Sequence, residues 1–168
     1  MAAAVPDPEL PMLTLADLGV LAEVETDGAE VTAWLTPTYS GCPAVAEMAA
    51  DVDRRLRAAG YRAVRVRLRL DPPWSTDLIT AEGRRKLAEA GIAPPHPSTA
   101  AAGAAGAAGP RPVALTLGPT RTAAALPVPC PRCGGADTEE LSRFGSTACK
   151  ALWRCRACRE PFERVKEI

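Results

Sequence analysis

The chain has 168 residues, of which 47% are apolar, 24% are charged and 4% are aromatic. This length accommodates one ordinary domain, or a smaller domain with an added module, and the composition predicts a core of Leu, Val and Ala. The charges balance to zero, which does not favour nucleic-acid binding, since phosphate recognition needs a strongly basic surface. We find no apolar run of the roughly 18 residues that span a membrane and no signal-peptide pattern, so we expect a cytoplasmic protein with reduced cysteines.

The first elements are a turn, a short helix and a hairpin. Residues 7–11 contain two prolines and an aspartate that can bond neighbouring amides, which predicts a turn. Residues 12–18 have helical spacing of apolar side chains and end at a glycine, which predicts a short amphipathic helix. Residues 20–26 and 31–35 flank an Asp-Gly pair, the strongest short signal for an antiparallel hairpin.

A loop over residues 36–43, rich in Pro, Gly and hydroxyl side chains, leads into a predicted helix over residues 44–59. Pro43 suits the first helical turn and Gly60 follows the last. Cys42 is therefore expected at a helix N-terminus. The helix dipole and the free amides there favour a thiolate, which predicts a lowered pKa and a raised metal affinity for Cys42.

Residues 63–70 alternate between apolar side chains and arginines, which predicts a strand with one solvated face. The arginines could instead bind phosphate, but a solvated sheet face is the commoner use of such a pattern. A polar loop follows at 71–77, and a helix capped by Ser75 or Thr80 is expected to end near residue 90. Trp74 in this loop either packs in the core or lies beside the Cys42 loop; the core is favoured.

Residues 94–112, rich in Pro, Ala and Gly, have no sustained apolar face and predict a flexible linker. The only histidine, His96, lies in this segment, where it could not be held as a general base. One short strand is expected at 113–117. We therefore divide the chain into a domain at 1–93, a linker at 94–112 and a module at 113–168.

Two Cys-x2-Cys pairs, Cys130 with Cys133 and Cys155 with Cys158, stand 21 residues apart in the C-terminal module. Four thiolates at such spacing can close a tetrahedral site, the arrangement of structural zinc, and two disulfides are the alternative. Hairpins usually present such pairs, so the module is expected to be β-rich. Cys149 is either a fifth, exchangeable ligand, a group that faces a partner, or a small buried side chain; the last is favoured.

Two sets of motifs resemble known families. The first set resembles the SufT-like domain of iron–sulfur assembly factors and comprises Asp7-Pro8-Glu9-Leu10-Pro11, Asp17-Leu18-Gly19, residues 36–43 (Thr-Pro-Thr-Tyr-Ser-Gly-Cys-Pro) and residues 74–79 (Trp-Ser-Thr-Asp-Leu-Ile). The second comprises residues 130–133, 144–155 and 160–162. Together they resemble the PaaD family, the D subunits of the bacterial phenylacetyl-CoA ring-epoxidase system, over nearly the whole chain apart from residues 97–112.

The resemblance implies an accessory factor that helps to supply an iron–sulfur or di-iron centre to a partner oxygenase or reductase subunit. By position, Cys42 matches the reactive cysteine of the SufT-like loop, where iron or a cluster would bind transiently. The four paired cysteines match a zinc knuckle that docks on the partner. Ala148 stands where the pattern would have proline. The accessory site residues that the resemblance implies are Cys149, Asp7, Thr38, Trp74 and Asp77.

Three other functions compete with this one. A zinc-dependent interaction subunit without metal delivery would leave Cys42 merely packed. An enzyme with Cys42 as a covalent nucleophile lacks a base outside the linker. Nucleic-acid binding through the basic residues of the tail lacks an aromatic stacking platform. For the fold we expect an α+β domain, with a small, mostly antiparallel sheet packed with helices, followed by a zinc ribbon.

Overall fold

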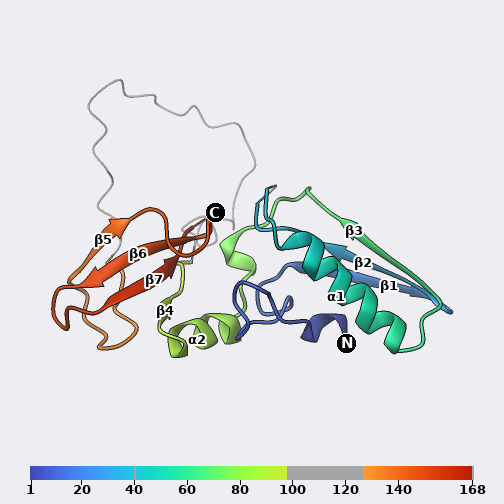
Figure 1. Cartoon of the computed structure of the whole chain (residues 1–168), viewed down its shortest axis with the longest axis horizontal. Helices are drawn as coiled ribbons and strands as arrows, with labels where there is room; N and C mark the ends of the chain where they lie inside the picture. The colour runs from blue at the N-terminus through green and yellow to red at the C-terminus, as the bar shows by residue number, and fades with distance from the viewer. Residues whose placement is uncertain (40, 98–126, 168) are drawn as a thin grey trace, which may run out of the picture.

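The computed structural model describes residues 1–39, 41–97 and 127–167 (Figure 1). The described residues form a three-stranded and a four-stranded sheet, two α-helices and two short 3-10 helices. In chain order the elements are η1 (Ala2–Ala4), β1 (Leu21–Asp27), β2 (Glu30–Leu35), α1 (Val45–Ala58), β3 (Ala63–Leu68), η2 (Thr76–Leu78), α2 (Ala81–Glu89), β4 (Ile92–Ala93), β5 (Thr138–Ser142), β6 (Lys150–Cys155) and β7 (Pro161–Val165). Within these described ranges, no helix has the length and apolar character needed to span a membrane.

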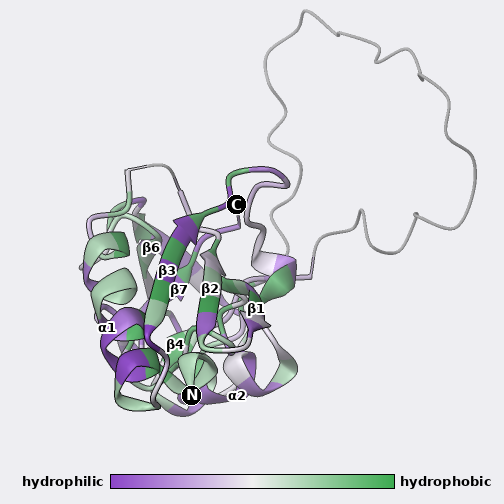
Figure 2. Cartoon of the chain, turned by 90° about the vertical axis from the view of Figure 1, so that its right-hand side faces the viewer, coloured by the Kyte–Doolittle hydropathy of each residue, from purple (hydrophilic) through white to green (hydrophobic). Residues whose placement is uncertain are grey.

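The first sheet has the order β1-β2-β3 and confirms the α+β class. β1 and β2 form the predicted antiparallel hairpin. β3 pairs parallel with β2, because α1 carries the chain back across the sheet before β3 begins. The sheet is thus mixed rather than mostly antiparallel. Figure 2 shows hydrophobic and hydrophilic residues alternating along α1 and β3, and the buried face of α1 presents Met48, Val52 and Leu56 to the core.

The prediction of a helix over residues 12–18 is wrong, because this segment forms turns and one isolated β-bridge. Its apolar side chains are buried as expected, with Leu13 and Leu15 fully inaccessible. Its backbone, however, bonds across to the preceding segment, since the Leu15 amide donates to the Val5 carbonyl and the Asp7 amide to the Leu13 carbonyl. These bonds to the preceding segment take the place of the i→i−4 hydrogen bonds that a helix over residues 12–18 would form.

The helix after the second loop follows its prediction. Thr80 caps α2 by accepting a hydrogen bond from the Gly83 amide, at 2.9 Å, and Ser75 caps η2 in the same way. Lys86 on α2 forms an ion pair with Asp17, with 2.8 Å between Nζ and Oδ2. This pair ties α2 to the N-terminal turns.

The second sheet has the order β4-β7-β6-β5, so it includes one strand from before the predicted linker. β5, β6 and β7 are antiparallel neighbours, and β4 pairs parallel with β7 through Ile92 and Ala93 (Figure 1). Val165 at the end of β7 in turn packs into the core of the N-terminal domain. The ribbon is therefore docked on the N-terminal domain.

His96 is held firmly, so the prediction that it lies in a loose linker is wrong. Its backbone amide donates to Glu167 Oε1 at 3.1 Å, and its ring lies 2.8 Å from Nη2 of Arg164. Its Nε2 lies 3.2 Å from the Pro127 carbonyl. The remainder of the predicted linker, and the strand expected at 113–117, lie outside the described residues.

Candidate functional site

The four paired cysteines come together at one end of the ribbon. Cys130 and Cys133 lie in the turn before β5, and Cys155 and Cys158 lie where β6 turns towards β7. One member of each pair is buried and the other exposed, with Cys155 fully inaccessible. The backbone of each turn also bonds internally, since the Gly134 amide donates to the Cys130 carbonyl and the Cys155 amide to the Glu160 carbonyl. These bonds hold the thiols in place.

The distances between the sulfurs fit a zinc ion. All four Sγ atoms lie within 4.8 Å of one another, with 3.8 Å between Cys130 and Cys158 and 3.6 Å between Cys133 and Cys155. A tetrahedral ion with Zn–S bonds of about 2.3 Å would place its ligands about 3.8 Å apart. A disulfide needs a separation of about 2.05 Å, so the alternative of two disulfides is not what the geometry supports. Four ligands complete the tetrahedron, and such a site stabilises the fold without an open position for chemistry.

Two local features prepare the four-cysteine site. Gly134 and Arg159 follow the two pairs in the left-handed region, with φ of 73° and 63°, which reverses the chain behind each pair. The backbone amide of Cys158, together with neighbouring thiols, lowers the pKa of Cys155 to about 7 against the opposing effect of burial. A thiolate is the form that binds metal, so this proton is readily displaced near neutral pH.

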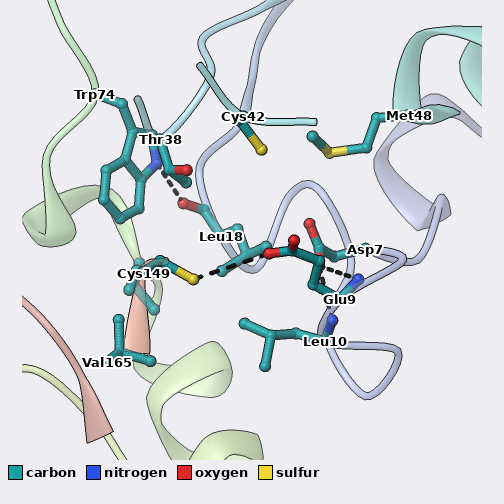
Figure 3. Close-up of a pocket in the computed structure, with 11 residues that line it drawn as sticks. Asp7, Glu9, Leu10, Leu18, Thr38, Cys42, Met48, Trp74, Cys149 and Val165 are labelled. Atoms are coloured by element: carbon teal, nitrogen blue, oxygen red, sulfur yellow. Dashed lines mark hydrogen bonds between the residues drawn. The ribbon is translucent and has the colours of Figure 1, made fainter. Parts of the chain in front are cut away.

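A second candidate site is a small cavity of about 30 Å³ where the N-terminal domain meets the ribbon (Figure 3). Cys42 contributes one thiol from the loop before α1, and Cys149 contributes another from the turn before β6. The cavity is lined by Asp7, Glu9, Leu10, Leu18, Thr38, Cys42, Met48, Trp74, Ile79, Cys149 and Val165. The structure therefore brings together two cysteines that are more than a hundred residues apart in sequence.

The environment of Cys42 differs from the one predicted. α1 begins at Val45, three residues beyond Cys42, and the pKa of the thiol is raised rather than lowered. Burial is the main cause, and the carboxylates of Glu9 and Asp7 add to it, outweighing the Ala44 amide and the Thr38 hydroxyl that favour the thiolate. At neutral pH Cys42 is therefore a protonated thiol until a cation displaces the proton.

The accessory candidates divide between the cavity and the surface. Asp7 is buried, and its Oδ1 accepts from the amides of Glu9 and Leu10, which confirms the predicted turn. Trp74 serves both roles considered for it: it is buried, donates from Nε1 to the Leu18 carbonyl at 2.9 Å, and lines the cavity.

Thr38 and Cys149 also line the cavity, whereas Asp77 lies exposed on η2 and is not among the lining residues. Sequence reasoning did not select Glu9, although it lies in the same proline-flanked turn as Asp7. The sequence signal that could have identified Glu9 was an acidic side chain next to the turn formed by Asp7.

The raised pKa of Cys42 predicts slow alkylation. Iodoacetamide should modify Cys42 slowly at pH 7, and the rate should rise as the pH approaches and passes the ordinary thiol value of 9, because the raised pKa leaves less thiolate at any lower pH. Glu9→Gln removes a charge that raises the pKa of both Cys42 and Cys149, so at pH 8 it should speed alkylation of both by about threefold. Peptide mass spectrometry reports each cysteine separately. Glu47→Gln, an exposed change on α1, is the control, and rapid modification of Cys42 at pH 7 would contradict the expectation.

Two sequence families match the two parts of the chain. Residues 3–68 match the family described as iron-sulfur cluster assembly protein. Residues 117–166 match the family described as the PaaD zinc beta ribbon domain. Together with the four-cysteine geometry, these matches define a protein that joins an iron–sulfur-assembly domain to a zinc ribbon.

A protein of Escherichia coli (strain K12), described as the putative D subunit of 1,2-phenylacetyl-CoA epoxidase, is 41% identical over 164 residues, which cover 98% of this chain and 87% of that protein. The chain belongs to the PaaD family of phenylacetyl-CoA epoxidase D subunits. Among solved structures, a domain of unknown function (DUF59) from Bacillus anthracis is 26% identical, covers 51% of this chain and 83% of its own, and gives a TM-score of 0.47.

Proposed function

We propose that the protein is a non-catalytic maturation factor of a phenylacetyl-CoA epoxidase system, working in the cytoplasm. In this role it assists assembly of an iron–sulfur or di-iron centre in an oxygenase or reductase subunit. Support comes from the relative described as a D subunit of phenylacetyl-CoA epoxidase and from the iron-sulfur cluster assembly match over residues 3–68. The cytoplasm fits six cysteines without a disulfide among them.

The observation that carries the proposal is the cavity in which the Cys42 thiol meets the carboxylates of Asp7 and Glu9. Thiolate and carboxylate ligands together suit a transition-metal cation. The same surroundings do not favour a nucleophile, because burial and the two carboxylates raise the pKa of the thiol, and the only histidine, His96, is engaged with Glu167 and Arg164. Cys42 is therefore better placed to hold a metal than to attack a substrate.

The zinc ribbon has a different part in this proposal. Its metal site is closed, so the ribbon contributes shape and a docking surface rather than cargo. A cargo ion held at Cys42 needs ligands from elsewhere to be released, and the client subunit supplies them when the two proteins are bound.

A second function is favoured by one observation, namely that Cys42 packs partly against the hydrophobic core. In this alternative the protein is a zinc-dependent interaction subunit of the same system and delivers no metal. The two functions differ in what happens to the client subunit when this protein is missing.

The test uses cells that lack their own PaaD-family protein and express the oxygenase and reductase subunits with either the wild-type chain or Cys42→Ser. The client subunits are then purified away from this protein, and their iron content and epoxidation are measured. We expect a loss of iron and of activity of about tenfold or more with Cys42→Ser, since the change removes a direct ligand. Ala46→Ser, an exposed change on α1, should behave as wild type.

Full iron and full activity with Cys42→Ser would overturn metal delivery. If the purified clients also held full iron but regained activity only after this protein was added back, the interaction subunit would be the correct function. If client activity did not depend on the chain at all, both would fail.

A further inference from the structure

The cavity at the domain junction offers more than the Cys42 thiol. Cys149 and Val165 reach it from the ribbon, while the other lining residues come from the N-terminal domain (Figure 3). Figure 3 shows the sulfurs of Cys42 and Cys149 and the carboxylates of Asp7 and Glu9 around one shared space. Any cation that enters this space meets ligands from both domains.

Cys149 is fixed in position by the ribbon strands. Its carbonyl accepts from the Lys166 amide at 2.9 Å, which joins the start of β6 to the end of β7. Its Sγ lies 3.1 Å from the Thr147 hydroxyl and 4.0 Å from Glu9 Oε2 across the domain junction. An ion bound tetrahedrally by a sulfur and a carboxylate oxygen would hold them about 3.6 Å apart, so this pair of ligands needs to shift by only a few tenths of an ångström.

The charges around the cavity favour a cation. Asp7 and Glu9 both face it, and none of the described residues that line it is basic. Lys150, whose charge also acts on Asp7, is ion-paired with Glu163, with 2.8 Å between Nζ and Oε2. Asp7 is 7% exposed and both of its backbone hydrogen bonds use Oδ1. Asp7 is thus a buried carboxylate, and a bound cation would offset the cost of burying its charge.

The size of the cavity restricts its occupant. A volume of about 30 Å³ exceeds the ~10–15 Å³ that one water needs, but is far below the ~300 Å³ of a small-molecule pocket. A single ion therefore fits, whereas an organic substrate does not.

We propose that the cavity is a mononuclear site for a divalent transition-metal ion, with the Cys42 thiolate from the N-terminal domain, the Cys149 thiolate from the ribbon and the Glu9 carboxylate as ligands. The inference rests on the proposed function, whose cargo it narrows to a single ferrous ion. It also gives the ribbon a direct ligand in the cargo site. On binding, the two thiols release their protons to solvent and no electron is transferred.

The ligands proposed at the domain junction are not yet arranged to surround an ion, whereas the four thiols of the ribbon are. Within the described ranges, the four paired cysteines are the one group of three or more candidate ligands whose donor atoms already converge. At the domain junction the ligands must still close around the ion. This arrangement suits cargo that binds reversibly, and ion binding would tighten the contact between the two domains.

The test is metal binding to the full-length chain under anaerobic conditions, after the ribbon has been loaded with one equivalent of zinc. Fe²⁺ and, as a spectroscopic probe, Co²⁺ are titrated in. Wild type should bind a second equivalent with thiolate-to-metal charge-transfer absorption, and X-ray absorption should count two sulfur ligands. Cys149→Ser should keep its zinc, lose one sulfur ligand and bind the second ion about tenfold or more weakly.

Two further variants keep the result interpretable. Glu9→Gln retains both thiols, so it should weaken binding while the sulfur count stays at two. Ala148→Ser, an exposed neighbour of Cys149, should match wild type.

An unchanged sulfur count and affinity in Cys149→Ser, with loss of binding in Cys42→Ser, would overturn the two-domain site and leave the proposed function standing. Absence of any second equivalent in wild type would overturn the two-domain site and the carrier role of Cys42 together. If Cys149→Ser also loses the ribbon zinc, Glu9→Gln decides instead. An unchanged affinity of Glu9→Gln for the second ion would refute the site.

Discussion

Cys155→Ser is expected to abolish zinc binding and unfold the ribbon. The Cys155 thiol is fully inaccessible, lies within the ribbon's hydrophobic cluster and is 3.6 Å from the Cys133 sulfur. Structural zinc contributes about 10–16 kcal/mol of apparent binding free energy in small modules, far more than the core of a ribbon of this size supplies. Zinc content should fall from one equivalent to near zero, and limited proteolysis should cleave within residues 127–167.

The control for this result is Cys149→Ser, which changes a cysteine of the same module that lies outside the four-thiol cluster. It should retain one equivalent of zinc and resist protease as wild type does. A strong chelator applied to wild type should reproduce the Cys155→Ser phenotype, and added zinc should reverse it. A Cys155→Ser protein with a full equivalent of zinc and an intact ribbon would refute the assignment.

Lys150→Met is expected to lower the free energy of unfolding by about 3 kcal/mol, because it leaves the Glu163 carboxylate without its buried partner. Lys150 is only 4% exposed, and its Nζ lies 2.8 Å from Glu163 Oε2. The other Glu163 oxygen accepts from the Ser146 amide at 2.7 Å, so the carboxylate cannot easily turn to water. Urea denaturation followed by circular dichroism measures the loss.

The effect of Lys150→Met should depend on pH. Burial alone would raise the pKa of Glu163, but Lys150 and the Ser146 amide outweigh burial, and the pKa lies below its ordinary value of 4.5. The stability from this pair is therefore present above pH 4.5 and is lost as the pH falls through the lowered pKa. The difference between Lys150→Met and wild type should shrink at pH 3.

Two comparisons test the reason for the loss. Arg85→Met breaks only exposed ion pairs on α2 and should lower the free energy of unfolding far less than Lys150→Met does. The double variant Lys150→Met/Glu163→Leu should recover part of the stability, since no charge is then left buried. An Lys150→Met protein as stable as wild type at pH 7 would show that the pair contributes nothing.

Local signals in the sequence predicted the local elements. The hairpin at β1 and β2, the helix α1 and the Thr80 cap follow from turn chemistry, periodicity and capping, all of which act within a few residues. The segment 12–18 was missed because its apolar spacing suits a helix, while its backbone pairs with the preceding segment, where the Leu15 amide donates to the Val5 carbonyl and the Leu13 carbonyl accepts from the Asp7 amide. The parallel pairing of β2 with β3 was missed because alternation in a strand does not reveal the direction of its neighbour.

The four-cysteine site was predictable because ligand spacing is itself a local property. The cavity at the domain junction was not. Cys42 and Cys149 line one cavity because the ribbon packs on the N-terminal domain through Val165 and through β4. β4 is a strand of two residues, which is too short to have a recognisable period. The pKa of Cys42 was predicted in the wrong direction because the sequence does not reveal its tertiary surroundings. Burial and the carboxylates of Asp7 and Glu9, which raise this pKa, come from tertiary packing.

The contact between His96 and the Pro127 carbonyl, at 3.2 Å, brings the two flanks of residues 98–126 against each other. The described segments on either side are thus in direct contact, and the placement of the ribbon against the N-terminal domain rests on this contact and on the pairing of β4 with β7. A change in the number of residues between positions 97 and 127 should therefore leave the geometry of both metal sites in place.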